Sequence, residues 1–221
     1  MKYIVNPIFP EGGVHLIGAV LRVAPQRLFL PWLSESDRQT TFLGHPSRPF
    51  NHFCVALDET RPSLQRKLHG LGYSATVRAV SIHEVRPLTV KGMAKLIPQD
   101  TEVLLIGDIG PLVQDEFDRD DLASSVMSQL RALAKERNLT IIASTWATEK
   151  NTGRERILGS AMWSRLADTV VILDPGSQPD SLTATIMPVN SQPEVVEVIP
   201  PLPFDAIQDD KLRLHAVFGL G

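Results

Sequence analysis

Two apolar segments with a helical pattern between them constrain the fold of this chain most strongly. The run Val103–Ile106 has no polar residue, and residues 139–144 form a second, mainly apolar run. Short runs of this kind are typical of strands buried on both faces, as in a parallel sheet covered by helices. Residues 121–138, between them, repeat their apolar side chains every 3.6 residues, as an amphipathic helix does. This order predicts an α/β fold with a mainly parallel central sheet.

The rest of the chain continues the alternation of strands and helices. The further predicted strands are 14–17, 53–57, 76–82 and 169–173, and the further predicted helices are 26–33, 62–72, 90–97 and 159–167. Segments Leu182–Pro188 and 194–199 alternate apolar and polar residues on either side of an NSQP turn. They are expected to form an antiparallel hairpin at the edge of the sheet. Residues 34–51 are polar and contain proline, and they are expected to form a loop.

The length of 221 residues is that of one large domain with an addition. Three prolines between positions 200 and 203 end the regular pattern, so we expect a single domain over 1–203 and a tail over 204–221. The net charge of −3 gives no global field that would attract nucleic acid. The N-terminus resembles no secretory signal, and no apolar run has the length of a membrane helix, so a cytoplasmic protein without membrane contact is expected.

The segment over residues 16–30, LIGAVLRVAPQRLFL, has the strand, loop and helix layout of a phosphate-binding P-loop. A P-loop needs glycines around the phosphates, a lysine that reaches them and a Ser or Thr hydroxyl for Mg²⁺. Aligned without gaps on that pattern, Ala19 and Ala24 occupy the outer glycine positions. Pro25 occupies the lysine position and Gln26 the hydroxyl position. The apolar frame of the motif is therefore kept while its phosphate-binding groups are lost.

Four further segments follow in a fixed order. They are ALDETRPSLQRKL from residue 56, LLIGD from residue 104, RILGSA from residue 156 and ADTVVIL from residue 167. With the first segment, they resemble the RecA-like P-loop ATPases, in particular the replicative-helicase, RepA and KaiC-like branch, over about residues 12–200. The resemblance implies a RecA-like central sheet flanked by helices and followed by an antiparallel hairpin, with a degenerate Walker A motif.

The resemblance also implies roles for individual residues. Asp108 matches the Walker B aspartate, which orients Mg²⁺ and its water. Asp58 stands at the position of the catalytic glutamate and is one methylene shorter. Lys150, Arg154 and Arg156 lie in the loop that faces DNA in this family. In the family hairpin a Lys-x-Arg pair reaches the neighbour's nucleotide, whereas residues 189–191 here read Val-Asn-Ser.

A nucleotide would find few partners in such a site. ATP brings about four negative charges, and without the lysine they would face Asp58 and Asp108. Each missing charge-assisted hydrogen bond to phosphate costs about 1.5–3 kcal/mol. We therefore expect hydrolysis to be lost and no bound cofactor, with ATP and Mg²⁺ bound only if the phosphate site works. The expected role is that of a structural or regulatory partner in DNA replication, recombination or repair, through self-association, a RecA-like partner or DNA.

Three alternatives stay open at this point. In the first, Arg22 and Arg27 rebuild the phosphate site and act with Asp108 in a working ATPase. In the second, the chain is a DNA-binding module without a nucleotide role, and residues 148–156 carry the binding. In the third, the fold is an unrelated α/β fold. The six histidines are scattered without ligand spacing, so no metal site is expected.

Overall fold

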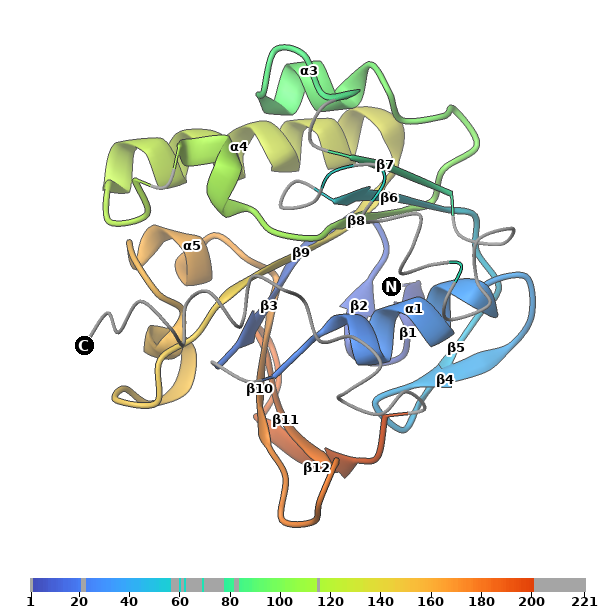
Figure 1. Cartoon of the computed structure of the whole chain (residues 1–221), viewed down its shortest axis with the longest axis vertical. Helices are drawn as coiled ribbons and strands as arrows, with labels where there is room; N and C mark the ends of the chain where they lie inside the picture. The colour runs from blue at the N-terminus through green and yellow to red at the C-terminus, as the bar shows by residue number, and fades with distance from the viewer. Residues whose placement is uncertain are drawn as a thin grey trace.

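The structure is a computed structural model, and it describes residues 2–20, 23–56, 60, 62, 69, 78–81, 84–114 and 116–200. Its centre is an eight-stranded sheet with the order β12-β11-β10-β3-β9-β8-β6-β7 (Figure 1). The strands are β3 (Val14–Ala19), β6 (His52–Ala56), β7 (Ala79–Ser81), β8 (Val103–Ile106), β9 (Thr140–Trp146), β10 (Thr169–Pro175), β11 (Leu182–Pro188) and β12 (Glu194–Val198).

The six strands from β10 to β7 run parallel, which confirms the predicted sheet. Strand β3 lies between β10 and β9, with Ile17 opposite Val171 on one side and Ser144 on the other. All residues of β3 and β8 are buried, as expected of strands covered on both faces. The C-terminal hairpin is also confirmed, since β10, β11 and β12 pair antiparallel at one edge of the sheet.

Helices flank this sheet, with α3 and α4 on one side and α1 on the other (Figure 1). Their bounds are α1 (Gln26–Ser34), α3 (Val90–Ala94), α4 (Asp120–Arg137) and α5 (Met162–Arg165), and the two short 3₁₀ helices are η2 (Gly110–Val113) and η3 (Gly153–Arg156). Helix α4 agrees with the helix predicted over 121–138. It ends at Arg137 and is followed by Asn138, which has a positive φ of 53°. The described part of the chain has no helix that is long and apolar enough to cross a membrane.

The helix predicted over 159–167 is wrong in extent, because α5 covers only Met162–Arg165. Gly159 has a φ of 87°, outside the helical region, so the helix cannot begin there. The backbone N–H of Ser160 donates to the carbonyl of Phe117, and its hydroxyl accepts from the N–H of Met162. These contacts fix residues 159–161 as a turn that precedes the helix.

A second, four-stranded antiparallel sheet corrects the loop predicted over 34–51. Its order is β2-β1-β5-β4, with β1 (Tyr3–Val5), β2 (Phe9–Pro10), β4 (Thr40–Phe42) and β5 (His45–Ser47). The sequence does not reveal this sheet, because strands of two or three residues are too short to show an alternation of apolar and polar side chains. Its pairing also joins distant segments, since Val5 lies opposite Ser47. The sheet is held by an aromatic cluster in which Trp32 of α1 contacts Phe42 and Phe50 at centroid distances of 4.6 and 4.7 Å.

Candidate functional site

The carboxyl ends of β3, β8, β9 and β10 meet at one edge of the parallel sheet. Ala19 at the end of β3 lies opposite Trp146 of β9 and Leu173 of β10, while Asp108 follows the end of β8. In open α/β sheets, ligands bind outside this edge, between the loops that leave the strands. Of the described candidate residues, Ala19 ends β3, Ala24 and Pro25 lie in the loop that follows, Gln26 and Arg27 lie in the first turn of α1, and Asp108 lies in the loop after β8. Arg22 and Asp58 lie outside the described residues.

In the described residues of the loop after β3, two backbone N–H groups form hydrogen bonds within the protein. The N–H of Val20 donates to the carbonyl of Leu173 at 3.2 Å, and the N–H of Val23 donates to the carbonyl of Val20 at 3.0 Å. Both side chains are buried in the core. A phosphate cradle requires backbone N–H groups that point away from the protein toward the ligand. These two N–H groups are instead used by internal hydrogen bonds.

Helix α1 begins next to this loop without the groups that bind phosphate in a P-loop. Ala24 is buried, and Pro25 and Gln26 are half-buried at the start of the helix. Pro25 has no N–H group, and its φ of −56° suits the beginning of a helix. The N–H of Arg27 donates to the carbonyl of Ala24. The positions that would hold lysine and Ser or Thr therefore serve to start the helix.

Arg27 lies in the first turn of α1 and is only 2% exposed. Its guanidinium donates to the backbone carbonyl of Asp180 at 2.8 Å and lies 3.5 Å from a carboxylate oxygen of the same residue. Burial lowers the pKa of Arg27, and the charge of Asp180 partly opposes this effect. Asp180 lies in the turn between β10 and β11 and has a positive φ of 63°. Arg27 thus ties α1 to the hairpin turn.

Replacing Arg27 by methionine tests this structural role. Arg27→Met keeps an apolar side chain of similar reach and removes the donor to Asp180. We expect the free energy of unfolding to fall by about 2 kcal/mol, as for a lost hydrogen bond to a charged group. The exposed pair of Arg38 and Glu35 gives a matched control, and Arg38→Met should change stability by less than about 0.5 kcal/mol. Urea unfolding measures both, and equal effects of the two variants would contradict the role assigned to Arg27.

Asp108 is half-buried at the end of β8 and caps the turn that follows. Its Oδ1 accepts from the N–H of Gly110 at 2.9 Å, at the start of η2. The N–H of Ile109 donates to the carbonyl of Ser144 in β9, and the hydroxyl of Ser144 donates to the carbonyl of Gly107. The carboxylate therefore has at least one structural partner. The Mg²⁺-orienting role of Asp108 and the role of Asp58 as the catalytic base stay predictions.

The loop over 148–156, expected to face DNA, is held to the protein by two of its three cations. Arg154 donates to the backbone carbonyls of Ser164, Ala167 and Met187 at 2.8, 3.1 and 2.6 Å. Burial lowers the pKa of Arg154, and Asp168 partly opposes this effect. Contacts to α5 with its C-terminal end and to β11 are those of a side chain that supports the fold.

Arg156 supports the same loop from its other end. Its guanidinium donates to the carbonyl of Thr148 at 2.8 Å and to both carboxylate oxygens of Asp174. Hydrogen bonds from Arg156 to Asp174 raise the pKa of the guanidinium. Lys150 is exposed on the loop, so it is the cation of the three that presents its charge to solvent. The contact with DNA remains a prediction, and Lys150 is its best-placed residue.

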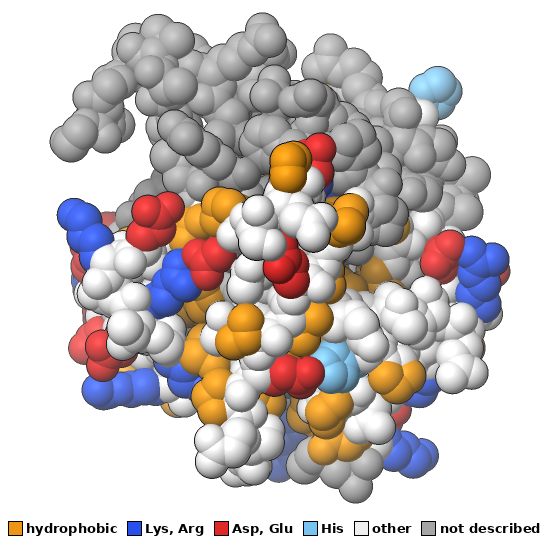
Figure 2. Space-filling model, turned by 90° about the horizontal axis from the view of Figure 1, so that it is seen from below, with side chains coloured by type: hydrophobic (Ala, Val, Ile, Leu, Met, Phe, Trp, Pro, Cys, Tyr) orange, Lys and Arg blue, Asp and Glu red, His pale blue; other side chains and the backbone are white. Residues whose placement is uncertain are grey.

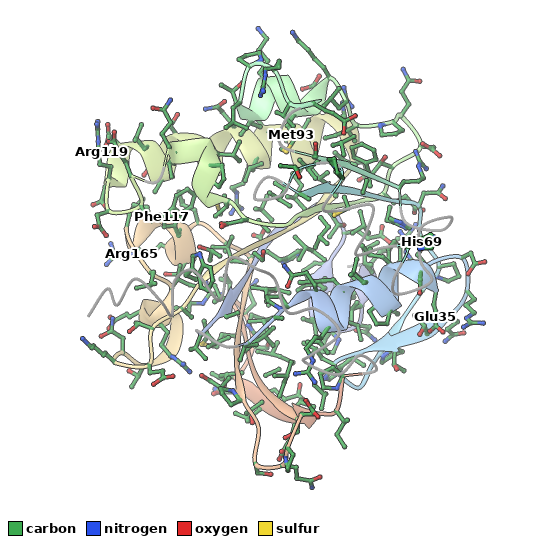
Figure 3. The ribbon with its side chains drawn as sticks, viewed as in Figure 1. Glu35, His69, Met93, Phe117, Arg119 and Arg165 are labelled. Atoms are coloured by element: carbon green, nitrogen blue, oxygen red, sulfur yellow. The ribbon has the colours of Figure 1, made fainter. Side chains whose placement is uncertain are left out.

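The RILGSA segment serves to join α5 to the turn before α4. The carbonyl of Phe117 accepts from the N–H of Ser160 at 2.8 Å and from the indole N–H of Trp163 at 3.2 Å. Figure 3 labels Phe117 between the two helices, with Arg119 and Arg165 on either side. A Cβ on Gly159 would lie 2.5 Å from the carbonyl oxygen of Phe117, so this position requires glycine. The hydroxyl of Ser160 donates to Asp120.

The described residues contain no group of three His, Cys, Asp or Glu side chains that could hold a metal ion. One buried polar atom at this edge, the hydroxyl of Thr145, has no hydrogen-bond partner among the described residues. The next residue, Trp146, is 42% exposed at the end of β9. The resemblance to the RecA-like ATPases places both residues at the sensor end of this strand, and this role stays a prediction.

Comparison with known proteins identifies the fold. No protein-family model and no curated protein sequence match the chain. Among solved structures, the RadB recombinase superposes with a TM-score of 0.60 over 86% of this chain and 87% of that chain, at 11% sequence identity. The KaiC-like protein PH0186 of the hyperthermophilic archaeon Pyrococcus horikoshii OT3 superposes with a TM-score of 0.59. The match covers 88% of this chain and 87% of that chain, at 15% sequence identity. The chain therefore has the RecA-like fold of P-loop ATPases.

Proposed function

We propose that this chain is a RecA-like protein that has lost ATP hydrolysis. It would act as a structural or regulatory partner in DNA replication, recombination or repair. The observation that carries the proposal is the loop between β3 and α1. This loop keeps its place in the fold, but it has no glycine, no lysine and no hydroxyl at the positions that would bind phosphate and Mg²⁺.

The contacts of this loop support the loss of phosphate binding. The N–H groups of Val20 and Val23 are bonded within the protein, and Pro25 has none to offer. The carboxylate of Asp108 lies at the same edge of the sheet, and its negative charge is unfavourable for the phosphates of ATP. Binding that loses several charge-assisted hydrogen bonds is expected to weaken from micromolar to millimolar or beyond.

The alternative of a working ATPase with an unusual phosphate site depends on Arg22 and Arg27. Arg27 is buried and donates to Asp180, so it would have to break this contact and turn toward solvent to reach a phosphate. The alternative of a DNA-binding module depends on Lys150, Arg154 and Arg156. Two of these cations already donate to groups of the protein, which leaves Lys150. Both alternatives therefore have weaker support than the loss of hydrolysis.

Calorimetric titration of the full chain with Mg·ATP tests the proposal. We expect no heat of binding up to millimolar nucleotide, and no phosphate release above the buffer blank. A nucleotide-competent RecA-like ATPase in the same buffer is the positive control for both readouts. Micromolar binding with turnover would overturn the proposal. If the activity then disappeared in a variant with Arg22→Ala and Arg27→Ala, the phosphate site would be a rebuilt one.

A further inference from the structure

Strand β12 is the last strand at one edge of the main sheet. It pairs with β11 on one side, and no described residue makes a backbone hydrogen bond to it on the other. Val195 is 66% exposed on this strand, and Ile199, directly after it, is 70% exposed. The space-filling view of this end of the molecule has apolar side chains next to acidic ones on its surface (Figure 2). Such an edge favours the addition of another strand.

The side chains of β12 alternate between two chemically different faces. Val196 and Val198 are partly buried and pack against the core. Val195, Glu197 and Ile199 are exposed on the opposite, outer face. Side chains that lie directly opposite each other on neighbouring strands are in contact. A strand added at this edge therefore meets one acidic side chain between two apolar ones on the outer face, and two apolar side chains on the inner face.

Glu197, at the centre of the outer face, is held in place as an anion. Its Oε1 accepts hydrogen bonds from the N–H and hydroxyl of Ser177 and from the hydroxyl of Ser181, each at 2.7 Å. These hydrogen bonds lower the pKa of Glu197 to about 2, so the carboxylate is ionised at neutral pH. A cation on the added strand would stabilise the pairing at this point, and a second carboxylate would destabilise it. Because the serines hold the carboxylate near the turn between β10 and β11, the cation needs a long side chain, as in lysine or arginine.

A second copy of β12 does not supply such a cation. Residues 194–199 contain two glutamates and no lysine or arginine. In an antiparallel pair of two copies, the register that brings Val195 opposite Ile199 places Glu197 opposite its own counterpart. The two nearest registers that keep the faces place Glu197 opposite Val195 or opposite Ile199. Like charges opposite each other destabilise a sheet, and an apolar neighbour leaves the carboxylate without a cation. The charges of this edge therefore disfavour pairing between copies of the chain.

We propose that the β12 edge binds an extended segment of a different protein, with a lysine or arginine opposite Glu197 and apolar side chains opposite Val195 and Ile199. Backbone hydrogen bonds to the edge would give the affinity, and the alternating side chains would give the specificity. The inner face of the bound segment would carry apolar side chains against Val196 and Val198. The inference is independent of the proposed loss of ATP hydrolysis, because it uses only the contacts of the C-terminal hairpin.

Two prolines limit the length of the bound segment. Pro193 precedes β12, and Pro200 follows Ile199. Proline has no N–H group and cannot donate a hydrogen bond to a neighbouring strand. The pairing is therefore confined to residues 194–199, and the alternation of five side chains around Glu197 is sufficient to define the partner.

Fluorescence anisotropy of two labelled synthetic peptides, titrated with the full chain, tests the proposal. The first peptide is Lys-Ile-Val-Lys-Val-Ile-Lys, which reads the same in both directions and so fits the edge in either direction. The second has glutamate in place of the central lysine. The wild type is expected to bind the lysine peptide about tenfold more tightly than the glutamate peptide, and Glu197→Lys is expected to reverse this preference. Glu197→Gln, which keeps an acceptor for the serines, should reduce the preference to about threefold or less.

Glu136→Lys is the matched control, because it makes the same change of net charge at an exposed position of α4. This variant should keep the preference of the wild type. Amide hydrogen exchange locates the bound peptide, and we expect the lysine peptide to slow exchange in β12 and to leave α4 unchanged.

Several results would overturn the proposal. They are the absence of binding to the full chain, equal affinity of the wild type for the two peptides, and protection from exchange outside the β12 edge. A loss of preference in Glu136→Lys equal to that in Glu197→Lys would reduce the effect to net charge. A dimer of the wild type in sedimentation velocity that the lysine peptide dissociates would make a second copy the occupant of the edge.

Discussion

Replacement of Trp32 by alanine is expected to lower the free energy of unfolding by about 3–5 kcal/mol, the range for removal of a large buried aromatic side chain. Trp32 is 3% exposed and packs on Phe42 and Phe50 with centroid distances of 4.6 and 4.7 Å. Its indole N–H donates to the hydroxyl of Ser47 at 3.0 Å. The variant would leave a cavity between α1 and the small sheet, and it would leave a buried hydroxyl without this donor. Urea unfolding followed by circular dichroism measures the change.

Trp146→Ala is the matched control for this variant. Trp146 has the same side chain but is 42% exposed at the end of β9. We expect its loss to cost about 1 kcal/mol or less, since little buried area is removed. A similar small effect of Trp32→Ala would contradict the packing described here, because it would mean that the small sheet contributes little to the stability of the domain.

Acid is expected to destabilise the protein through His15, by about 3 kcal/mol between pH 6.5 and pH 4. His15 is fully buried in β3, and burial lowers its pKa to about 4. The unfolded chain takes up a proton on this histidine near pH 6.5, whereas the folded protein does so only near pH 4. Unfolding therefore binds a proton throughout this interval, so stability is complete above pH 6.5 and falls as the pH is lowered to 4. Asp168 and Arg131 are the charged groups that act on the ring, in opposite directions.

Urea unfolding at pH 7.5, 6 and 5 measures this dependence in the wild type and in His15→Phe. The phenyl ring keeps the apolar contact with Phe9, whose ring centroid lies 5.0 Å from that of His15. His52, with a pKa also lowered to about 4 by burial, titrates in both proteins and cancels in the comparison. His69 is exposed, and His69→Gln is the control. The free energy of unfolding of this variant should depend on pH as that of the wild type does. If the free energy of unfolding of His15→Phe depended on pH as strongly as that of the wild type, His15 would not be the source of the acid destabilisation.

Local sequence pattern was sufficient to predict the elements that make the parallel sheet. The apolar run of β8 and the 3.6-residue period of α4 are properties of neighbouring residues, so they can be read without knowledge of the fold. The same is true of the hairpin, where alternation and a turn coincide. The absence of glycine, lysine and hydroxyl groups from the loop after β3 is likewise a property of the sequence alone, since no fold can add a side chain that the chain does not contain.

The small sheet and the roles of the arginines were decided by the tertiary structure. Strands of two or three residues leave no readable period, and β1 and β5 pair only because the aromatic cluster brings distant segments together. Arg27 finds its acceptor in Asp180, 153 residues away, and Arg154 binds the carbonyl of Met187, 33 residues away. From the sequence, each of these arginines could serve as a phosphate or DNA ligand. Which group a cation contacts depends on the segments that the fold places beside it, and local pattern carries no information about those segments.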